Sequence, residues 1–396
     1  MSSHIMPTYY NQMAIAFDHG KGAWLWDTEG KTYLDALTGI AVCSLGHAHP
    51  AITSAITEQA HKLLHTSNTY RIPNQEKLSD KLCEVSGMEQ VYFCNSGAEA
   101  NEAALKLTRM YARKKNIANP TVITMLNSFH GRTFATMCAT GTERIQTGFE
   151  PLMPGFVHLP LNDIAALQAQ IAGNPDVVAI MLECTQGDGG LQSATPEYMQ
   201  TIRRLCDQQD LLMIVDEVQT GIGRTGKWFA FQHYNVMPDV VSSAKALGNG
   251  IPIGACLTRD KACNLFGPGK HGCTFGGSPI ACAVGLAVLD TMQKDQVPAN
   301  AERMGTYLQN RLKETLHKLP AVKEIRGRGL MIGVELDRNA MALLAIGLKH
   351  GLLFNVVANQ VVRILPPLII TTAEADEIVN RLAASITEFA AQPLQV

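Results

Sequence analysis

The chain has 396 residues, of which 46% are hydrophobic and 17% are charged. This length allows a large domain and a smaller one, and the composition is typical of a globular protein with a substantial core. The formal net charge of −2 gives no reason to expect nucleic acid or an acidic membrane as a partner. Small molecules are the expected ligands.

Ten cysteines are present without a CxxC pair or a regular spacing, so neither a zinc ribbon nor a disulfide framework is indicated. Buried thiols in a reducing cytosol are the simplest interpretation. The N-terminus lacks the basic stretch and apolar core of a signal peptide, and no run approaches the roughly 18 apolar residues of a membrane span. The sequence therefore predicts a cytoplasmic protein that is neither exported nor anchored.

The N-terminal segment contains a predicted antiparallel hairpin. Trp24 and Trp26 lie on its first strand, residues 32–34 form the second, and the chain turns at residues 27–30. The two histidines of GHAHP, residues 46–50, have a spacing found in metal sites. Because no third ligand is nearby, a structured loop is the favoured interpretation.

Helices are predicted over residues 51–65 and 74–85, and a strand, an Asn-Ser-Gly turn and a further helix follow. Ser96, Gly97 and Ala98 lie at this turn. Small residues at a helix N-terminus leave backbone N–H groups free to hold an anion such as a phosphate. Ser96 can also act simply as an N-cap, and the two roles are compatible.

Two further apolar runs end in aromatic or charged residues. The first leads into Phe129 and Arg132, and residues 177–182 lead into Glu183 and Asp188. An aromatic side chain at a strand end can stack on a planar ring, and an arginine beside it can bind a carboxylate through two hydrogen bonds. Taken alone, Phe129 would be a core residue and Arg132 a surface residue.

The most informative stretch covers residues 211–254, where two short apolar runs lead into Asp216 and Lys245, 29 positions apart. Short, continuous runs of branched residues bounded by turn residues are typical of buried strands in a parallel sheet. Ligands of such sheets bind at the carboxyl ends of the strands. Asp216 and Lys245 are therefore expected to face one crevice.

Pyridoxal phosphate (PLP) requires both of these residue types. Its aldehyde needs a lysine amine for a Schiff base, and its pyridinium nitrogen needs a carboxylate to stay protonated. Asp216 and Lys245 suit these two tasks. The alternative is that Asp216 caps the following turn and Lys245 is a solvated lysine at a helix start.

The same stretch contains Gly221, Gly223 and Gly226, whose spacing matches a dinucleotide-binding loop. That fingerprint has meaning only where it opens a helix directly after a strand, and the KWFAF run that follows is not helix-like. The glycines are expected to form a flexible loop. A nicotinamide-dependent oxidoreductase remains an alternative.

The C-terminal part alternates helices with short strands. The predicted elements are helices over residues 279–294, 303–319 and 372–390 and strand-like runs within residues 325–336 and 361–370. Arg363 lies in the second of these runs. Because a buried arginine usually has an anionic partner, Arg363 is expected to be either ion-paired or a carboxylate receptor.

The predicted fold class is α/β, with a large domain over residues 51–294 in which helices flank a mostly parallel central sheet. A smaller α+β domain is expected to form from residues 1–50 and 295–396.

Taken together, the motifs resemble those of one family, the class III, fold-type I PLP-dependent aminotransferases. The resemblance extends over essentially the whole chain and is carried, in chain order, by GAWLWDTEGKTYLD, LGHAHP, FCNSGAEANEAALKL, SFHGRT, LECTQGDGG, IVDEVQTGIGRTGKWFA, SSAKALGNGIPIGA, HGCTFGGSPIA and the RILPPL segment. These motifs are highly specific for the family and less specific for the substrate.

The resemblance implies a role for each matching residue at the cofactor ring. Lys245 is the Schiff-base lysine and Asp216 is the partner of the pyridinium nitrogen. Val218 packs on the ring face opposite Phe129, and Gln219 approaches the ring hydroxyl.

The resemblance also implies the residues that bind phosphate and carboxylates. Gly97 and Ala98 hold the cofactor phosphate together with Thr274 from the neighbouring subunit, which makes the protein an obligate homodimer. Arg132 receives a distal carboxylate, and Arg363 receives the α-carboxylate of glutamate or 2-oxoglutarate.

Two residues depart from the family pattern. The acidic residue that pairs with the α-carboxylate arginine is usually glutamate and is Asp188 here, one methylene shorter. Cys273 occupies a position beside the phosphate threonine where serine is common and touches substrate. Both departures concern the substrate, not the reaction type.

The resemblance implies transfer of an amino group from an amine donor to 2-oxoglutarate. The motifs are most like those of enzymes that act on the terminal amine of N-acetylornithine, in arginine biosynthesis. Succinylornithine, ornithine and 4-aminobutyrate are alternative donors, and a PLP-dependent aminomutase is an alternative reaction.

Overall fold

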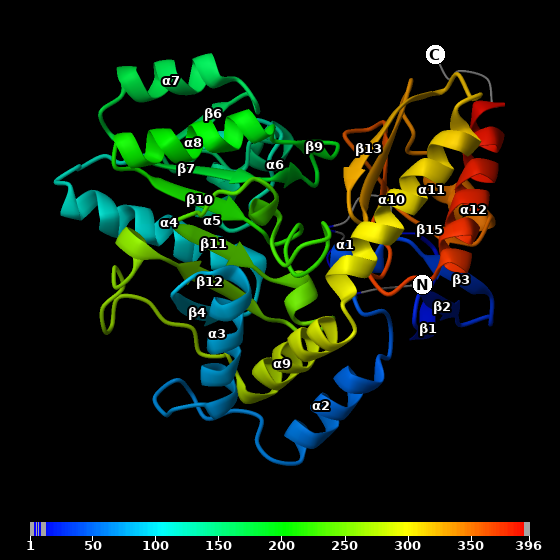
Figure 1. Ribbon diagram of the computed structural model, residues 1–396, viewed down its shortest axis with the longest axis horizontal. Coiled ribbons are helices and arrows are strands. Elements are labelled where there is room, and N and C mark those ends of the chain that lie inside the picture. The colour runs from blue at the N-terminus through cyan, green and yellow to red at the C-terminus, as the bar shows by residue number, and fades with distance from the viewer. Residues whose placement is uncertain (1–3, 5, 7, 9–12, 392–396) are drawn as a thin grey trace.

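The computed structural model describes residues 4, 6, 8 and 13–391. At its centre is a seven-stranded sheet with the order β4-β12-β11-β10-β7-β5-β6 (Figure 1). The strands are β4 (Gln90–Cys94), β12 (Gly254–Thr258), β11 (Val240–Ser243), β10 (Leu212–Asp216), β7 (Val177–Glu183), β5 (Thr121–Met125) and β6 (Phe156–Leu159). Only β12 runs antiparallel to its two neighbours, so the predicted mostly parallel sheet is confirmed.

Helices cover both faces of this sheet because its strands are apolar on both faces. In β10, Leu212 and Ile214 belong to the core cluster that includes α4 (Gly97–Lys114). Met213 and Val215 belong to the cluster that includes α8 (Pro196–Gln208). Successive strand residues point to opposite faces, so a strand covered on both sides is a continuous apolar run in the sequence.

Three helices pack together below the sheet in Figure 1: α2 (Pro50–Ala60), α3 (Pro73–Ser86) and α9 (Pro279–Lys294). Each begins with a proline in its first turn. The N–H groups of a first turn have no partner inside the helix, so the N–H group that proline lacks costs no helical hydrogen bond there. The last two match the predicted helices, whereas α2 ends five residues before the predicted end at residue 65.

The beginning and the end of the chain share a second sheet. Its strands are β1 (Phe17–Lys21), β2 (Trp24–Asp27), β3 (Thr32–Asp35) and β15 (Leu352–Leu353). The antiparallel pairing of β2 with β3 confirms the predicted hairpin. The pairing of β3 with β15 is parallel and attaches the N-terminal segment to the C-terminal part of the chain.

A third, antiparallel sheet has the order β13-β14-β17-β16 and lies on the right in Figure 1. Its strands are β13 (Val322–Arg328), β14 (Met331–Leu336), β17 (Val361–Ile364) and β16 (Asn355–Val357), and the helices of this part are α10 (Val297–Leu316), α11 (Leu343–Lys349) and α12 (Thr372–Ala390). The predicted closing helix matches α12, whereas α10 begins six residues before the predicted start at residue 303. The domain boundaries after residues 50 and 294 stay a prediction.

The expectation of a flexible glycine loop is wrong. Residues 221–226 do form a loop, but Ile222, Arg224 and Thr225 are almost fully buried. A Cβ atom on Gly329, which lies outside the loop, would come within 2.5 Å of the Thr225 carbonyl carbon. Backbone packs directly on backbone here, so the loop is held firmly between other segments.

The histidines of the GHAHP segment have structural partners. His47 Nε2 lies 2.7 Å from Asp35 Oδ2, and the side chain of His49 accepts a hydrogen bond from the Ala51 N–H at the start of α2. The hydrogen bond that His47 donates to Asp35 is the main reason that the pKa of His47 is raised to about 9. Within the described residues, no group of three or more His, Cys, Asp or Glu side chains is arranged to hold a metal ion.

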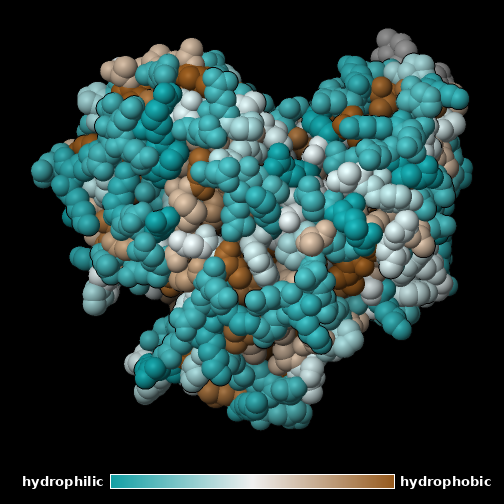
Figure 2. All heavy atoms as spheres, in the orientation of Figure 1, coloured by the Kyte–Doolittle hydropathy of each residue, from teal (hydrophilic) through white to brown (hydrophobic). Residues whose placement is uncertain are grey.

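The remaining elements are short or lie at the edge of the sheet: α1 (Thr38–Ala41), α5 (Phe134–Ala139), α6 (Glu143–Gln146), α7 (Ile164–Gly173), β8 (Thr185–Gln186) and β9 (Gln192–Ser193). None of the helices in the described part of the chain has the length and apolar character needed to cross a membrane. Figure 2 shows a mainly hydrophilic face with a notch between the large sheet region and the C-terminal sheet region.

Candidate active site

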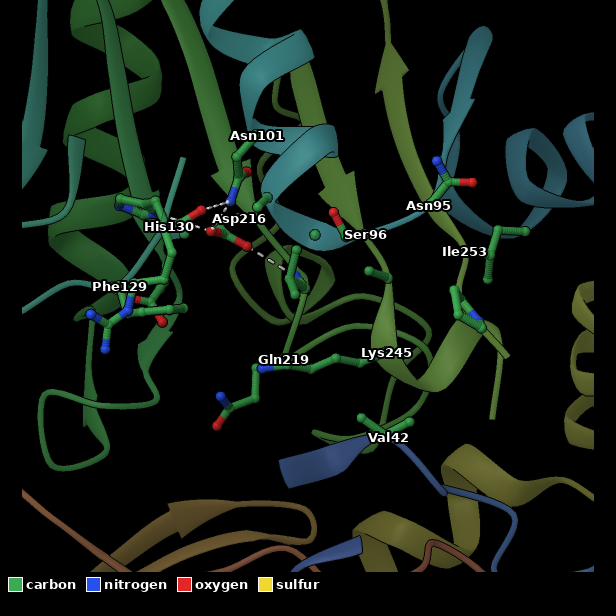
Figure 3. A pocket seen from close by; sticks show the side chains of 18 of the residues that line it. Val42, Asn95, Ser96, Asn101, Phe129, His130, Asp216, Gln219, Lys245 and Ile253 are labelled. Atoms are coloured by element: carbon green, nitrogen blue, oxygen red, sulfur yellow. Dashed lines mark hydrogen bonds and ion pairs between the residues drawn. The ribbon is translucent and has the colours of Figure 1, made fainter. Parts of the chain in front are cut away.

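A cavity of about 370 Å³ lies at the carboxyl ends of the central strands (Figure 3). Glu183, the last residue of β7, and Asp216, the last residue of β10, line it together with Lys245, which follows β11. The N-terminal turn of α4 forms another wall. Asp216 and Lys245 therefore face one crevice, at the edge of the sheet where ligands of parallel sheets bind.

The carboxylate of Asp216 is held in place by four donors. Its Oδ2 atom accepts hydrogen bonds from Asn101 Nδ2 at 2.7 Å and lies 2.8 Å from His130 Nδ1. Its Oδ1 atom accepts from the Val218 N–H at 3.0 Å and from Ser242 Oγ at 3.3 Å. The four donors fix the orientation of both carboxylate oxygens.

His130 is fully buried behind Asp216. Burial disfavours its charged form, but the hydrogen bond and the negative charge of Asp216 outweigh that effect, so the pKa of His130 is raised. Its Nε2 atom has no hydrogen-bond partner within the described residues. His130 and Asp216 therefore share a proton beside the cavity, and this proton is shielded from bulk water.

Lys245 lies at the turn between β11 and a short 3₁₀ helix, with its backbone in the left-handed region at φ 43°. Burial lowers the pKa of its amine to about 8, and the positive charge of Arg363 contributes in the same direction. A lysine with a lowered pKa is more often neutral near pH 7 and is a better nucleophile.

The N-terminus of α4 is built to approach a ligand closely. Ser96 caps the helix by accepting a hydrogen bond from the Glu99 N–H at 3.1 Å. Gly97 begins the helix, and a Cβ atom at this position would lie 2.6 Å from Val218 Cγ1. The first amides of a helix have no partner inside it, so the Gly97 and Ala98 N–H groups at the cavity wall suit an anion such as phosphate.

Phe129 and Val218 also line the cavity. The Phe129 N–H donates to Glu183 Oε2 at 3.1 Å, and Glu183 Oε1 accepts from the Gly187 N–H at 3.1 Å. Burial raises the pKa of Glu183 to about 7. Glu183 thus fixes the loops that follow β5 and β7.

Arg363 and Asp188 form an ion pair at one side of the cavity wall. Arg363 Nη1 donates to Asp188 Oδ1 at 2.8 Å, to the Gly187 carbonyl at 2.9 Å and to Gln219 Oε1 at 3.3 Å. Its Nε atom donates to Asn355 Oδ1 at 3.0 Å. The shorter aspartate therefore does reach the arginine, and Gln219, which lines the cavity, connects the pair to it.

Arg132 lines the cavity, and its guanidinium carbon lies 5.9 Å from the centre of the Phe129 ring. Cys273 and Thr274 are not among the lining residues of this chain. Thr274 is exposed, and Cys273 Sγ accepts a hydrogen bond from Asn95 Nδ2 at 3.0 Å. The structure thus brings together all of the predicted site residues except Cys273 and Thr274, with Arg363 and Asp188 just behind the wall.

Sequence reasoning did not identify Asn101 and His130 as site residues. Asn101 lies one helical turn after Gly97 on α4, so its side chain points to the same side of that helix. His130 follows Phe129 directly after β5. Both signals were present in the sequence, but a lone asparagine or histidine indicates no partner until the fold brings Asp216 beside it.

Comparison with known proteins gives a consistent result. Residues 5–386 match the model of the family described as Aminotransferase class-III. The chain is 49% identical over 387 residues to the acetylornithine aminotransferase of Nitrosomonas europaea, covering 98% of each chain. It is 48% identical over 388 residues to the acetylornithine aminotransferase of Caldanaerobacter subterraneus, covering 97% of this chain and 98% of the relative.

Solved structures of similar proteins support the same assignment. The ornithine aminotransferase from Toxoplasma gondii aligns with a TM-score of 0.93 at 34% identity, covering 98% of this chain and 93% of that chain. The N-acetylornithine aminotransferase from Stenotrophomonas maltophilia aligns with a TM-score of 0.84 at 36% identity, covering 96% and 97%. The chain belongs to the class III aminotransferases and is a PLP-dependent, fold-type I enzyme.

Proposed function

We propose that this enzyme transfers the terminal amine of N2-acetyl-L-ornithine to 2-oxoglutarate, giving the semialdehyde and L-glutamate in arginine biosynthesis. The observation that supports the reaction is the placement of Lys245 and Asp216 at one cavity beside the N-terminus of α4. The choice of donor rests on relatives named acetylornithine aminotransferase that are 44–49% identical over nearly the whole chain.

The residues at the cavity fit PLP in charge and shape. Gly97 lets the start of α4 approach Val218 closely at the cavity wall, and the helix N-terminus there carries partial positive charge for a phosphate. Asp216 at the other end suits a protonated ring nitrogen, and Phe129 and Val218 offer apolar surfaces for a planar ring. When bound, PLP supplies an electron sink for the reacting carbon.

The residues of the chain perform the remaining tasks. Lys245 would hold the cofactor covalently through Nζ, and its amine would act as the general base and acid that moves a proton at the reacting carbon. Asp216, fixed by Asn101 and His130, would keep the ring nitrogen of the bound cofactor protonated. Gln219, which lines the cavity, would approach the ring hydroxyl.

Two substrates must use one pocket in turn. Glutamate carries a carboxylate on its reacting carbon, whereas the terminal amine donor does not. Arg363 paired with Asp188 is neutralised and suits the amine donor, and Arg363 released from Asp188 binds the α-carboxylate of the oxo-acid. Arg132, exposed at the cavity, receives the distal carboxylate of either substrate.

The same proposal includes a cytoplasmic homodimer. Thr274 is exposed, and its neighbour Phe275 is 64% exposed, although large apolar side chains are normally covered. A partner subunit that covers this loop would receive Thr274 at its own phosphate site and Cys273 beside its substrate.

Ornithine is the second candidate donor, because the ornithine aminotransferase from Toxoplasma gondii shares the fold with a TM-score of 0.93. A panel of half-reactions separates the candidates. The PLP-loaded enzyme is mixed with N-acetylornithine, succinylornithine, ornithine, 4-aminobutyrate or glutamate, and the loss of cofactor absorbance is followed. We expect N-acetylornithine to be among the best donors, and a slow reaction with it would reject the proposed substrate while leaving the aminotransferase class intact.

A further inference from the structure

The buried loop at residues 221–226 contains an arginine that neither cofactor nor substrate binding explains. Arg224 is 0% exposed and, with Arg363, is one of the two largest fully buried side chains of the described chain. Burial lowers its pKa to about 9, and Asp35 is the acid that favours its charged form. No hydrogen bond from Arg224 to a carboxylate is present among the described residues, although a buried charge is costly without a paired ion.

The guanidinium instead joins three distant segments of the chain. Nη1 donates to the Pro366 carbonyl at 2.6 Å and to the Leu330 carbonyl at 3.0 Å, and Nη2 donates to Ser44 Oγ at 3.1 Å. The planar fork of an arginine can reach several acceptors at once, whereas the single ammonium of a lysine cannot occupy the same positions. Arg224 therefore works as a cross-link between the glycine loop, the N-terminal segment and the C-terminal sheet.

Two of these acceptors terminate the strand pair that holds Arg363. In the register of β14 and β17, Gly333 lies opposite Arg363 and Ile332 lies opposite Ile364. The pairing ends at Ile332 and Ile364, and the same register continued by two residues would set Leu330 opposite Pro366. Proline has no N–H group, so Pro366 cannot donate across the pair to Leu330.

Arg224 takes the place of that missing hydrogen bond. The Leu330 N–H donates to the Arg224 carbonyl at 3.1 Å, while the Arg224 side chain donates to the carbonyls on both strands. The end of the β14–β17 pair is thus attached to the loop that follows β10. The same loop holds Gln219, which accepts from Arg363 Nη1 at 3.3 Å.

The strand of Arg363 is therefore held at two places: at the arginine itself, by Gly187, Asp188 and Gln219, and at the end of the strand, by Arg224. Ser44, the third acceptor, lies two residues after Val42, which lines the cavity, and its carbonyl accepts from the Leu368 N–H at 2.7 Å. A shift of the Arg224 contacts would move β17 relative to the site.

We propose that Arg224 is a positioning residue that sets the place of Arg363, and thereby the recognition of the α-carboxylate of glutamate and 2-oxoglutarate. This inference rests on the proposed role of Arg363 as carboxylate receptor. The glycine loop at residues 221–226 thus has a task in substrate recognition. Its buried arginine supports the reaction with the substrate that carries an α-carboxylate and has little effect on the reaction with the terminal amine donor.

The test compares the two half-reactions in PLP-loaded Arg224→Lys enzyme. Because misplacement by about 1 Å can cost roughly 10²-fold in rate, we expect kcat/KM for glutamate to fall by about 10- to 100-fold. For N-acetylornithine we expect a fall of less than about 3-fold, since this donor places no carboxylate at Arg363. Ser44→Ala removes one of the three contacts and should change the ratio in the same direction by a smaller amount.

Arg203→Lys is a matched control. Arg203 on α8 also donates to a backbone carbonyl, that of Met237 at 3.0 Å, and to Asp239 at 2.9 Å. The Arg203→Lys variant should leave the ratio of kcat/KM for glutamate to that for N-acetylornithine unchanged. An Arg224→Lys enzyme in which both half-reactions fall equally, or neither falls, overturns the positioning role and assigns Arg224 to general stability.

Arg363→Gln distinguishes this inference from the function on which it rests. If Arg363→Gln leaves the glutamate half-reaction intact, the proposed carboxylate receptor is wrong, whatever Arg224 does. If Arg363→Gln abolishes the glutamate half-reaction selectively, Arg224→Lys should add no further glutamate-specific loss in the double variant. If Arg224→Lys lowers kcat/KM for glutamate in the double variant by as much as it does alone, Arg224 acts independently of Arg363.

Discussion

Asp216 illustrates how far a single carboxylate depends on its surroundings. Asn101, His130, Ser242 and the Val218 backbone all donate to it, so both oxygens are oriented before any ligand binds. Such preorganisation avoids reorganisation of the site during the reaction. The charge of the carboxylate, more than its shape, is what a protonated ring nitrogen requires.

Asp216→Asn tests this requirement for charge. The variant keeps the volume and much of the hydrogen bonding, so PLP should still bind. Proton abstraction from the donor should slow by roughly 10²- to 10⁴-fold, the size of effect typical for a lost acid–base function. Single-turnover measurements follow the step directly, and an unchanged rate would remove Asp216 from the chemistry.

The amine of Lys245 gives a prediction about pH. Its pKa is lowered to about 8, so the amine is mostly protonated at pH 7 and mostly neutral at pH 9. Only the neutral amine attacks an aldehyde, so capture of added PLP by cofactor-free enzyme should accelerate from pH 7 to pH 9 and then level off.

Arg363→Gln provides the control for this pH profile. The positive charge of Arg363 helps to lower the pKa of Lys245, so removing it should move the midpoint of the capture rate to higher pH. Stopped-flow absorbance measures both profiles. A rate that is flat between pH 7 and pH 9 contradicts the lowered pKa.

At the scale of elements, the start of α4 controls the approach of the cofactor. A Cβ atom on Gly97 would lie 2.6 Å from Val218 Cγ1, so Gly97→Ala must push Val218, which lines the cavity. We expect cofactor affinity to fall by about 10-fold, corresponding to roughly 1.4 kcal/mol. Equilibrium dialysis or fluorescence titration with PLP measures this change.

Gly173→Ala is the matched control for Gly97→Ala. Gly173 ends α7, and nothing lies within 4 Å of a Cβ atom added there. This variant should bind PLP normally and gain about 0.4–1 kcal/mol of stability, because alanine has fewer unfolded conformations than glycine. Equal affinities in the two glycine variants would show that the close approach at Gly97 is unimportant.

The sequence predicted the elements whose pattern is local. The apolar runs of β10 and β11, the hairpin of β2 and β3, and α12 with its capping threonine and Glu374 all carry their signals in adjacent residues. These signals depend on periodicity and capping chemistry, which act over a few positions.

The features that the sequence did not reveal depend on distant contacts. The antiparallel direction of β12 is set by its neighbours β4 and β11, and no residue type within the strand encodes it. The burial of Arg224 requires Ser44, Leu330 and Pro366 to converge from three separate segments. Glycine spacing alone therefore suggested a flexible loop where the fold builds a firm one.

At the scale of the whole molecule, the central sheet and the C-terminal sheet meet at the ion pair of Arg363 and Asp188. Asp188→Ala removes the acidic partner, while Gly187, Asn355 and Gln219 still provide oxygen acceptors for Arg363. The arginine should then be permanently available to a carboxylate. We expect the ratio of kcat/KM for glutamate to that for N-acetylornithine to rise by about 10-fold.

Asp207→Ala is the corresponding control, since Asp207 pairs with Arg203 but is 64% exposed. It should leave the ratio unchanged. A ratio that also stays unchanged in Asp188→Ala would identify the pair of Arg363 and Asp188 as a fixed structural ion pair, leaving selection between the two substrates to other residues.

The central claim is that Lys245 holds the cofactor at this cavity, and peptide mapping after borohydride reduction tests it most directly. Reduction makes the bond between the lysine and PLP permanent, so mass spectrometry can locate it. We expect the modification on the peptide that contains Lys245, and no stable modification or imine absorbance of bound PLP in Lys245→Ala. Modification of a different lysine, or near-normal turnover by Lys245→Ala, would contradict the account.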